Sequence, residues 1–92
     1  MKIQIDSPEG LGAVVRATRK TLGLRQDDTA GAIGVSEHFL SKVARGSDTV
    51  QWGKLFQVLQ QLGISITVNA PIADATEPDM SLQTGTENKE LR

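Results

Sequence analysis

The sequence of 92 residues contains no cysteine, so neither a disulfide framework nor a thiolate metal site is available to it. It has a single histidine and shows no phosphate-binding loop, no paired-carboxylate motif and no cluster of metal ligands. No apolar run is long enough to span a bilayer, and the N-terminal stretch MKIQIDSPEG lacks the apolar core of a signal peptide. These absences predict one small cytoplasmic domain that is not an enzyme, uses no cofactor and has no membrane partner.

Charge is distributed unevenly along the chain, although the net formal charge is only −1. Residues 1–69 carry a net charge of +2, whereas residues 70–92 carry −3. The C-terminal stretch is rich in Thr, Asp, Glu and Pro and contains no aromatic residue, so it cannot bury enough apolar surface to offset the entropy of ordering. We therefore predict a folded domain over residues 1–69 and a disordered acidic tail over residues 70–92.

Hydrophobic periodicity and helix-end residues predict four helices in the folded domain, at about residues 8–22, 26–33, 36–44 and 51–62. Ser36 is expected to cap the third of these helices, and glycines are expected to end the others. The strongest apolar stripe belongs to the last helix and consists of Trp52, Leu55, Phe56, Leu59 and Leu62. This stripe predicts that Trp52 packs in the core rather than acting as a stacking platform for bases.

A short β-strand is predicted after the last helix, because Ile64, Ile66 and Val68 alternate with polar residues. A strand exposes a row of N–H and C=O groups and needs a partner. Two partners are possible: the stretch KIQI at residues 2–5 of the same chain, or the same strand of a second molecule across a two-fold axis. The pattern alone leaves both alternatives open.

The helices predicted at residues 26–33 and 36–44 are joined by Gly34-Val35-Ser36. The glycine permits a tight turn, the valine can fill the angle between the helices, and the serine can cap the second helix. This is the chemistry of a helix-turn-helix, in which the second helix enters the DNA major groove by its N-terminal end. Paired helices with a glycine turn also occur without DNA binding, so this string by itself is not decisive.

The longer stretch LGAVVRATRKTLGLRQDDTAGAIGVSEHFLSKVARG resembles the helix-turn-helix domain of the Xre and lambdoid-repressor family. The matching residues are Leu11-Gly12, Arg16, Arg19-Lys20, Gly23-Leu24, Gln26, Ala30, Ile33-Gly34-Val35-Ser36, Leu40-Ser41 and Arg45-Gly46. The following stretch, TVQWGKLFQVLQQLGISITV, is similar to the final helix and strand of HipB-type antitoxins. The resemblance covers residues 9–69. It implies a mostly α, four- to five-helix domain with a short C-terminal β-strand that pairs across a dimer.

Three residues depart from the family pattern. Thr29 stands where the family usually has leucine, which predicts weaker core packing of the second helix. Ala44 stands where many members carry a glutamate, so any ion pair made by that carboxylate is absent. Arg25 takes the usual position of a capping threonine, which predicts a less tightly capped start of the second helix.

The resemblance implies which residues contact DNA. Those expected to read base edges are Ser36, Glu37, His38, Ser41 and Lys42. Those expected on the DNA backbone are Gln26, Arg16, Arg19, Arg25 and Arg45. The chemistry is compatible, because hydroxyls donate or accept, His38 can donate to guanine, and Glu37 can accept from the cytosine amino group. The alternative for each is an ordinary solvated side chain, and for Phe39 we expect packing beneath the turn rather than contact with a thymine methyl.

The function implied is sequence-specific repression. A dimer held by Ile64, Ile66 and Val68 would place two recognition helices in successive major grooves of a palindromic operator, about 34 Å apart. Resemblance to HipB implies an antitoxin that autoregulates a toxin–antitoxin operon and neutralises a HipA-like serine/threonine kinase by forming a complex with it. The alternatives are a stand-alone phage-type or restriction-control regulator, and a protein-interaction adaptor that does not bind DNA.

Overall fold

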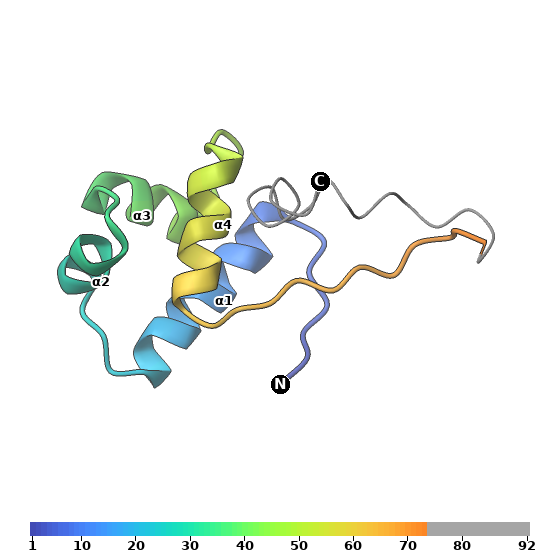
Figure 1. Ribbon diagram of the computed structural model, residues 1–92, viewed down its shortest axis with the longest axis horizontal. Coiled ribbons are helices and arrows are strands. Elements are labelled where there is room, and N and C mark those ends of the chain that lie inside the picture. Colours follow the sequence, from blue (N-terminus) through green and yellow to red (C-terminus); the bar gives the residue numbers. More distant parts are fainter. Residues whose placement is uncertain (74–92) are drawn as a thin grey trace, which may run out of the picture.

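A computed structural model describes residues 1–73, which form four helices linked by short turns (Figure 1). The helices are α1 (Pro8–Thr21), α2 (Gln26–Ile33), α3 (Glu37–Arg45) and α4 (Trp52–Gln61). These bounds confirm the four predicted helices and the mostly α fold. Residues 1–6 and 64–73 run as irregular chain outside the helices (Figure 1). The acidic tail predicted over residues 70–92 lies mostly outside the described residues, and no helix among the described ones is long and apolar enough to cross a membrane.

Local capping explains where the helices begin and end. The Ser7 Oγ accepts a hydrogen bond from the Gly10 amide at 3.0 Å, and the Ser36 Oγ accepts one from the Phe39 amide at 2.9 Å. Each bond satisfies one of the amide donors that the first turn of a helix leaves free. At the other end of α2, Gly34 adopts φ +90°, the left-handed conformation that stops a helix.

The closest contact between helices is the one between α1 and α3, and it depends on two glycines. Gly12 is buried, and a Cβ built on it would lie 2.6 Å from the carbonyl oxygens of both Val43 and Ala44. Gly46, which ends α3, has φ +78°, and a Cβ there would lie 2.4 Å from the Cα of Glu9. Side chains at these two positions would force the backbones apart, so the glycines allow α1 to pack directly on the C-terminal end of α3.

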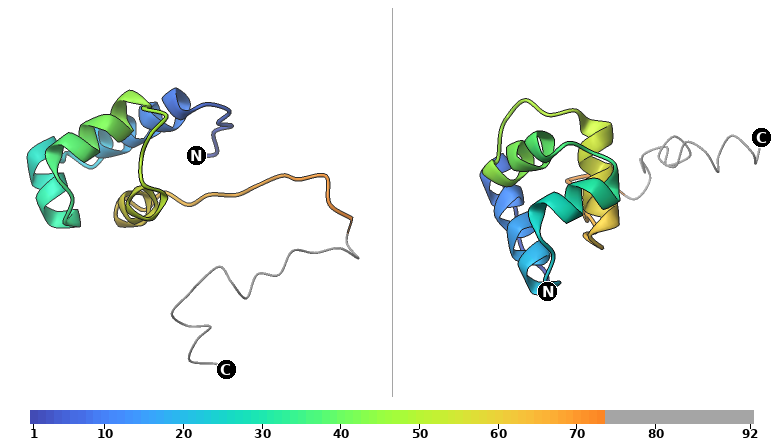
Figure 2. Two further views of the ribbon diagram at one scale, coloured as in Figure 1. Left: turned by 90° about the horizontal axis from the view of Figure 1, so that it is seen from above. Right: turned by 90° about the vertical axis from the view of Figure 1, so that its left-hand side faces the viewer.

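The core lies where all four helices meet (Figure 2). Its fully buried side chains include Val15 of α1, Leu40 of α3, and Val58 and Leu59 of α4. The Gln57 Nε2 donates to the carbonyl oxygen of Ile33 at 2.9 Å and so ties α4 to the end of α2. This bond also satisfies one of the carbonyl groups that the last turn of α2 leaves free.

Thr29, which replaces the usual leucine, is also buried, with 4% of its surface exposed. Its hydroxyl donates to the Arg25 carbonyl oxygen at 2.6 Å, so the polar group carries no unsatisfied donor into the core. Arg25 makes no side-chain cap on α2, as its departure from threonine predicts. The start of α2 is therefore held by this buried hydroxyl rather than by a cap.

The expectation that Trp52 packs in the core is wrong. Trp52 is 74% exposed and Phe56 is 47% exposed, and their rings stack on each other with centroids 5.9 Å apart. The buried stripe of α4 consists of Leu55, Val58, Leu59 and Leu62. At about 100° per residue, Phe56 lies about 110° and Trp52 about 70° around the helix from the centre of that stripe. The aromatic pair therefore forms a second apolar stripe on α4, on the flank of the buried one and largely exposed.

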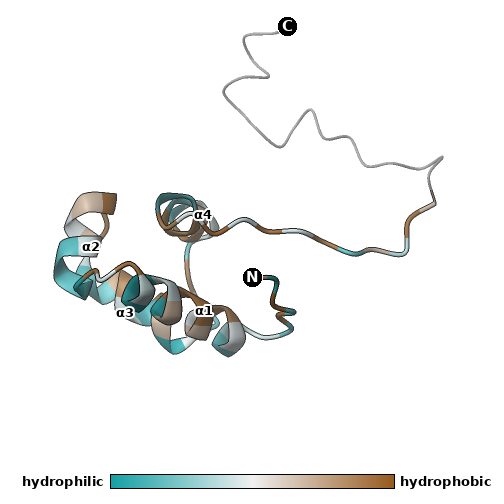
Figure 3. Ribbon diagram, turned by 90° about the horizontal axis from the view of Figure 1, so that it is seen from below, coloured by the Kyte–Doolittle hydropathy of each residue, from teal (hydrophilic) through white to brown (hydrophobic). Residues whose placement is uncertain are grey.

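The strand predicted over residues 64–69 is not formed, and none of the residues 1–73 is in a β-strand. The Ile64 amide donates to the Leu59 carbonyl oxygen at 2.8 Å, and its side chain packs on the core. Ile66 and Val68 are 49% and 74% exposed, and the segment runs clear of the helices with alternating apolar and polar residues (Figure 3). Pairing with residues 2–5 is also absent. A strand requires a ladder partner, and residues 1–73 of the single chain do not supply one.

The contact between α1 and α3 predicts that Gly12→Ala destabilises the fold. The added methyl group would overlap two carbonyl oxygens of α3, and overpacking of this kind costs about 1–3 kcal/mol. Gly31→Ala in α2 is the matched control, because a Cβ there meets nothing within 4 Å and the backbone φ is not positive. That change should leave the free energy of unfolding unchanged or raise it by up to about 1 kcal/mol. Chemical denaturation distinguishes the two, and equal effects would contradict the close contact.

The exposure of the aromatic pair predicts that Trp52→Ala changes the free energy of unfolding of the isolated chain by less than about 1 kcal/mol. Leu59→Ala, on the buried stripe of the same helix, should cost about 2–5 kcal/mol because it leaves a cavity. Thermal unfolding followed by circular dichroism measures both. If the tryptophan variant is as damaged as the leucine variant, another molecule covers this stripe in solution.

Candidate nucleic-acid interface

The turn between α2 and α3 is closed by backbone hydrogen bonds. The amides of Gly34 and Val35 both donate to the Ala30 carbonyl oxygen, at 2.9 and 3.0 Å. Val35 is half-buried against the core, and Ser36 then caps α3. The three residues act as the sequence predicts: the glycine turns the chain, the valine fills the angle between the helices, and the serine starts the second helix.

One face of α3 is buried and the other carries the residues expected to read bases. Leu40, Val43 and Ala44 are buried, whereas Ser36, Glu37 and His38 are exposed at the N-terminal end of the helix. Ser41 and Lys42 are half-exposed one turn further along. The structure thus brings the five predicted residues together on the outer surface and the first two turns of one helix.

Phe39 packs against the core, as expected, and does not belong to the outer surface. The Lys54 ammonium of α4 lies 5.9 Å from the centre of its ring, a geometry in which a cation is attracted to an aromatic face. This places one positive charge of α4 beside the N-terminal end of α3. The sequence does not indicate a role for Lys54, because no local pattern links residue 54 to residue 39.

Gln26, expected to hold a phosphate, is the first residue of α2 and is half-exposed. Among the residues that the structure describes, its side-chain amide has no hydrogen-bond partner. The first turn of α2 also has free backbone N–H groups, which favour anions. Gln26 and this helix end can therefore serve one negatively charged ligand together.

Each of the four arginines predicted on the DNA backbone has a partner within the chain. The Arg16 guanidinium donates to the backbone carbonyl oxygen of Ala44 and so anchors α1 to α3. This contact does not need the glutamate side chain that many family members carry at that position. The Arg19 Nη1 donates to the Leu24 carbonyl oxygen at 2.8 Å and braces the turn before α2. Arg16 and Arg19 therefore have structural contacts that their positions in sequence did not indicate.

The other two arginines have side-chain partners. The Arg45 Nη1 is 3.3 Å from the Ser41 Oγ, one turn away on α3. The Arg25 Nε and Nη2 donate to the two carboxylate oxygens of Asp27, at 3.1 and 2.9 Å. Both arginines are exposed, so a ligand that offers a stronger acceptor can exchange with these partners.

Asp27 also accepts a hydrogen bond from the Asp28 backbone amide at 2.8 Å. The pKa of Asp27 lies below its usual value, mainly because of the hydrogen bond from the Arg25 side chain and next because of this amide. The sequence does not indicate this pair, because Asp27 is explained equally well as an acidic residue in the first turn of a helix. Only the orientation of the Arg25 side chain reveals it.

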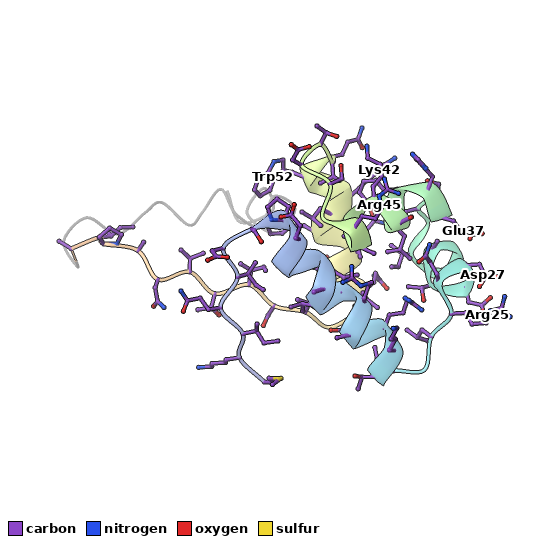
Figure 4. All side chains as sticks on the ribbon, turned by 180° about the vertical axis from the view of Figure 1, so that it is seen from behind. Arg25, Asp27, Glu37, Lys42, Arg45 and Trp52 are labelled. Carbon is purple, nitrogen blue, oxygen red and sulfur yellow. The ribbon has the colours of Figure 1, made fainter. Side chains whose placement is uncertain are left out.

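The labelled side chains of α2 and α3 lie along one side of the molecule. In Figure 4, Arg25, Asp27 and Glu37 follow one another upward along that side towards Arg45 and Lys42, while Trp52 lies beyond them at the start of α4. The surface is polar and carries charges of both signs. Within residues 1–73, no group of His, Asp or Glu side chains is placed to hold a metal ion. This surface offers hydrogen-bond donors, acceptors and cations to a partner, but no site for metal chemistry.

Comparison with known proteins agrees with this geometry. Residues 10–68 match the model of a helix-turn-helix domain family. The chain is 46% identical over 71 residues to an uncharacterized HTH-type transcriptional regulator, y4mF, of Sinorhizobium fredii. That alignment covers 77% of this chain and 93% of the relative.

Solved structures share the arrangement of helices. A chain of the HipA-HipB-O2-O3 complex superposes with a TM-score of 0.68 at 25% identity, over 77% of this chain and all of that one. A chain of the HipB-O4 20mer complex gives the same values. The clp gene regulator ClgR of C. glutamicum is 34% identical, with a TM-score of 0.56 over 67% of this chain and 80% of its own. The fold is therefore HipB-like.

Proposed function

The chain belongs to the helix-turn-helix domain family of DNA-binding transcriptional regulators, a class without enzymatic activity, and we propose that it is a dimeric repressor and antitoxin. The observation that carries the proposal is the outer face of α3. The residues at its N-terminal end, Ser36, Glu37 and His38, are polar and exposed, while its opposite face packs in the core. The HipB chains with the same fold are in complexes named HipA-HipB-O2-O3 and HipB-O4 20mer.

The roles of the residues follow from their chemistry. Ser36, His38 and Ser41 hydrogen-bond base edges in the major groove, and Lys42 contacts an acceptor on guanine. The Ser36 Oγ already accepts from the Phe39 amide, so towards DNA it acts as a donor. Glu37 accepts from a cytosine amino group, because a carboxylate beside a phosphate would be repelled. Gln26 holds a phosphate at the N-terminus of α2.

The arginines contribute to the part of the binding free energy that comes from contacts with the DNA phosphates. Arg25 and Arg45 exchange their exposed intramolecular partners for phosphates. Arg16 and Arg19 add to the positive electrostatic potential that the domain presents to DNA. Their hydrogen bonds also hold α1 in place. The specificity of the complex then resides in α3, and most of the salt dependence resides in these arginines.

Dimerisation proceeds through the segment 64–69. Within residues 1–73 this segment has no ladder partner after Ile64, and Ile66 and Val68 are exposed. Pairing with the same segment of a second molecule satisfies the backbone and covers those apolar side chains, since an edge of this kind readily pairs with another chain. A two-fold axis at this point relates two copies of α3, one for each half-site of a palindromic operator.

The antitoxin role rests on the likeness to HipB, which is found with HipA in one of the solved complexes. By that likeness, the chain autoregulates a toxin–antitoxin operon and neutralises a HipA-like kinase. The likeness to ClgR, named as a clp gene regulator, favours a second candidate: a stand-alone transcriptional regulator. Coexpression with a kinase-like protein encoded beside it decides between them. A stable complex that abolishes kinase activity supports the antitoxin role, and no association supports the stand-alone regulator.

Base reading by α3 predicts different effects for two single substitutions. His38→Ala should reduce the preference for the operator over mismatched DNA by about 1–3 kcal/mol, because one base contact is lost. Gln26→Ala should weaken binding to all sequences about equally, because a phosphate contact carries no sequence information. Fluorescence anisotropy with operator and scrambled duplexes measures both. Unchanged affinity in both variants would remove the assignment of this face.

Pairing across a two-fold axis predicts that the double change Ile66→Asp with Thr67→Pro splits the dimer. Proline lacks the ladder donor, and an aspartate buried in the interface would have no partner for its charge. The four helices should remain folded, because both side chains are exposed in the single chain. Sedimentation and circular dichroism test this, and operator binding should fall by more than for the loss of one base contact. A variant that stays dimeric places the interface elsewhere, for example on the Trp52–Phe56 stripe.

A further inference from the structure

We propose that Asp27 is an internal competitor of the DNA phosphate at the start of α2, and that it limits the affinity of this face for the nucleic-acid backbone. The inference rests on the proposed DNA-binding role of α2 and α3. It adds an element that opposes binding and that acts through Arg25. Glu37, at the start of α3, is another exposed carboxylate on this side of the molecule, but it has no arginine partner among the described residues (Figure 4).

The geometry gives the Asp27 carboxylate donors of the kind that bind anions. Asp27 accepts from the Nε and Nη2 of Arg25, at 3.1 and 2.9 Å, and from the Asp28 amide at 2.8 Å. A side-chain guanidinium and a backbone amide at a helix N-terminus are the donors that a DNA phosphate uses. The intramolecular carboxylate therefore occupies donors that backbone binding requires.

Stability does not account for this ion pair. The Arg25 side chain is 76% exposed and the Asp27 side chain is 41% exposed. Ion pairs with this exposure contribute little to folding. Their effect on a polyanion is larger, because the carboxylate both repels a phosphate and occupies the guanidinium that would attract it. For DNA to use Arg25, the phosphate must displace Asp27.

Asp28 provides a matched comparison. It is one residue further along α2, is exposed, carries the same charge, and has no arginine partner among the described residues. Asp28→Asn removes one negative charge and nothing else. Asp27→Asn removes the same charge and also replaces the ion pair with Arg25 by at most a neutral hydrogen bond, which a phosphate displaces more easily. The difference between the two variants is the effect of the competition.

The experiment uses the full chain and a random-sequence duplex as the probe, with affinity measured by fluorescence anisotropy over a range of salt concentrations. We expect Asp27→Asn to tighten binding by about three- to tenfold at low salt, and Asp28→Asn by no more than about twofold. The plot of log affinity against log salt should steepen by about 0.9 for Asp27→Asn, the value for one added phosphate contact, and should not change for Asp28→Asn.

A double-mutant cycle isolates Arg25. In the Arg25→Gln background, Asp27→Asn should tighten binding no more than Asp28→Asn does, because no guanidinium remains to be freed. Thermal unfolding of each variant confirms that the helices are intact. Equal effects of Asp27→Asn and Asp28→Asn, a gain that persists without Arg25, or weaker binding by Asp27→Asn would overturn the proposal. A wild-type chain that binds no duplex at low salt would overturn the DNA-binding role itself, and this inference with it.

Discussion

The direct packing of α1 on the end of α3 is the constraint on which the rest of the domain depends. Two glycines, Gly12 and Gly46, let the backbones approach to distances that no side chain would permit. Arg16 then spans the same junction through the carbonyl oxygen of Ala44. Because this contact lies at the C-terminal end of α3, it holds the helix by the end that is not offered to a ligand. The N-terminal end of α3 is left exposed and is set by the turn after α2.

The charged groups of the candidate interface serve both the fold and the ligand. Arg16 and Arg19 hydrogen-bond backbone carbonyls and connect helices, whereas Arg25 and Arg45 pair with side chains at the surface. Backbone carbonyls held in helices and turns are fixed partners, but exposed carboxylates and hydroxyls are exchangeable ones. When the domain approaches a polyanion, some of its arginines are therefore already hydrogen-bonded within the chain. This weakens the non-specific electrostatic attraction, which increases with each arginine that is free to contact a phosphate.

Apolar surface is left uncovered at both ends of α4. The Trp52–Phe56 stripe lies on its N-terminal half, the segment 64–69 follows its C-terminal end, and both expose large side chains. An extended segment with unpaired backbone groups is unfavourable for an isolated domain, and its burial in an assembly removes both the apolar exposure and the unpaired ladder. The features that the core does not use are thus the ones that a second molecule could cover.

The sequence by itself determined the four helices and the turn between α2 and α3. Caps such as Ser7 and Ser36, and glycines such as Gly34, act within one turn of chain, so their effect can be predicted from neighbouring residues. The outer position of His38 follows in the same way from the spacing of Leu40 and Val43.

Only the tertiary structure decided which side of α4 is buried, and it placed Trp52 outside although the stripe of the sequence included it. It also decided the partners of the arginines and left residues 64–69 without a ladder. These outcomes depend on groups distant in sequence or on the orientation of long side chains. The periodicity of a helix defines its apolar sector only to within one residue on either edge, and which edge is covered is set by the helices that pack against it.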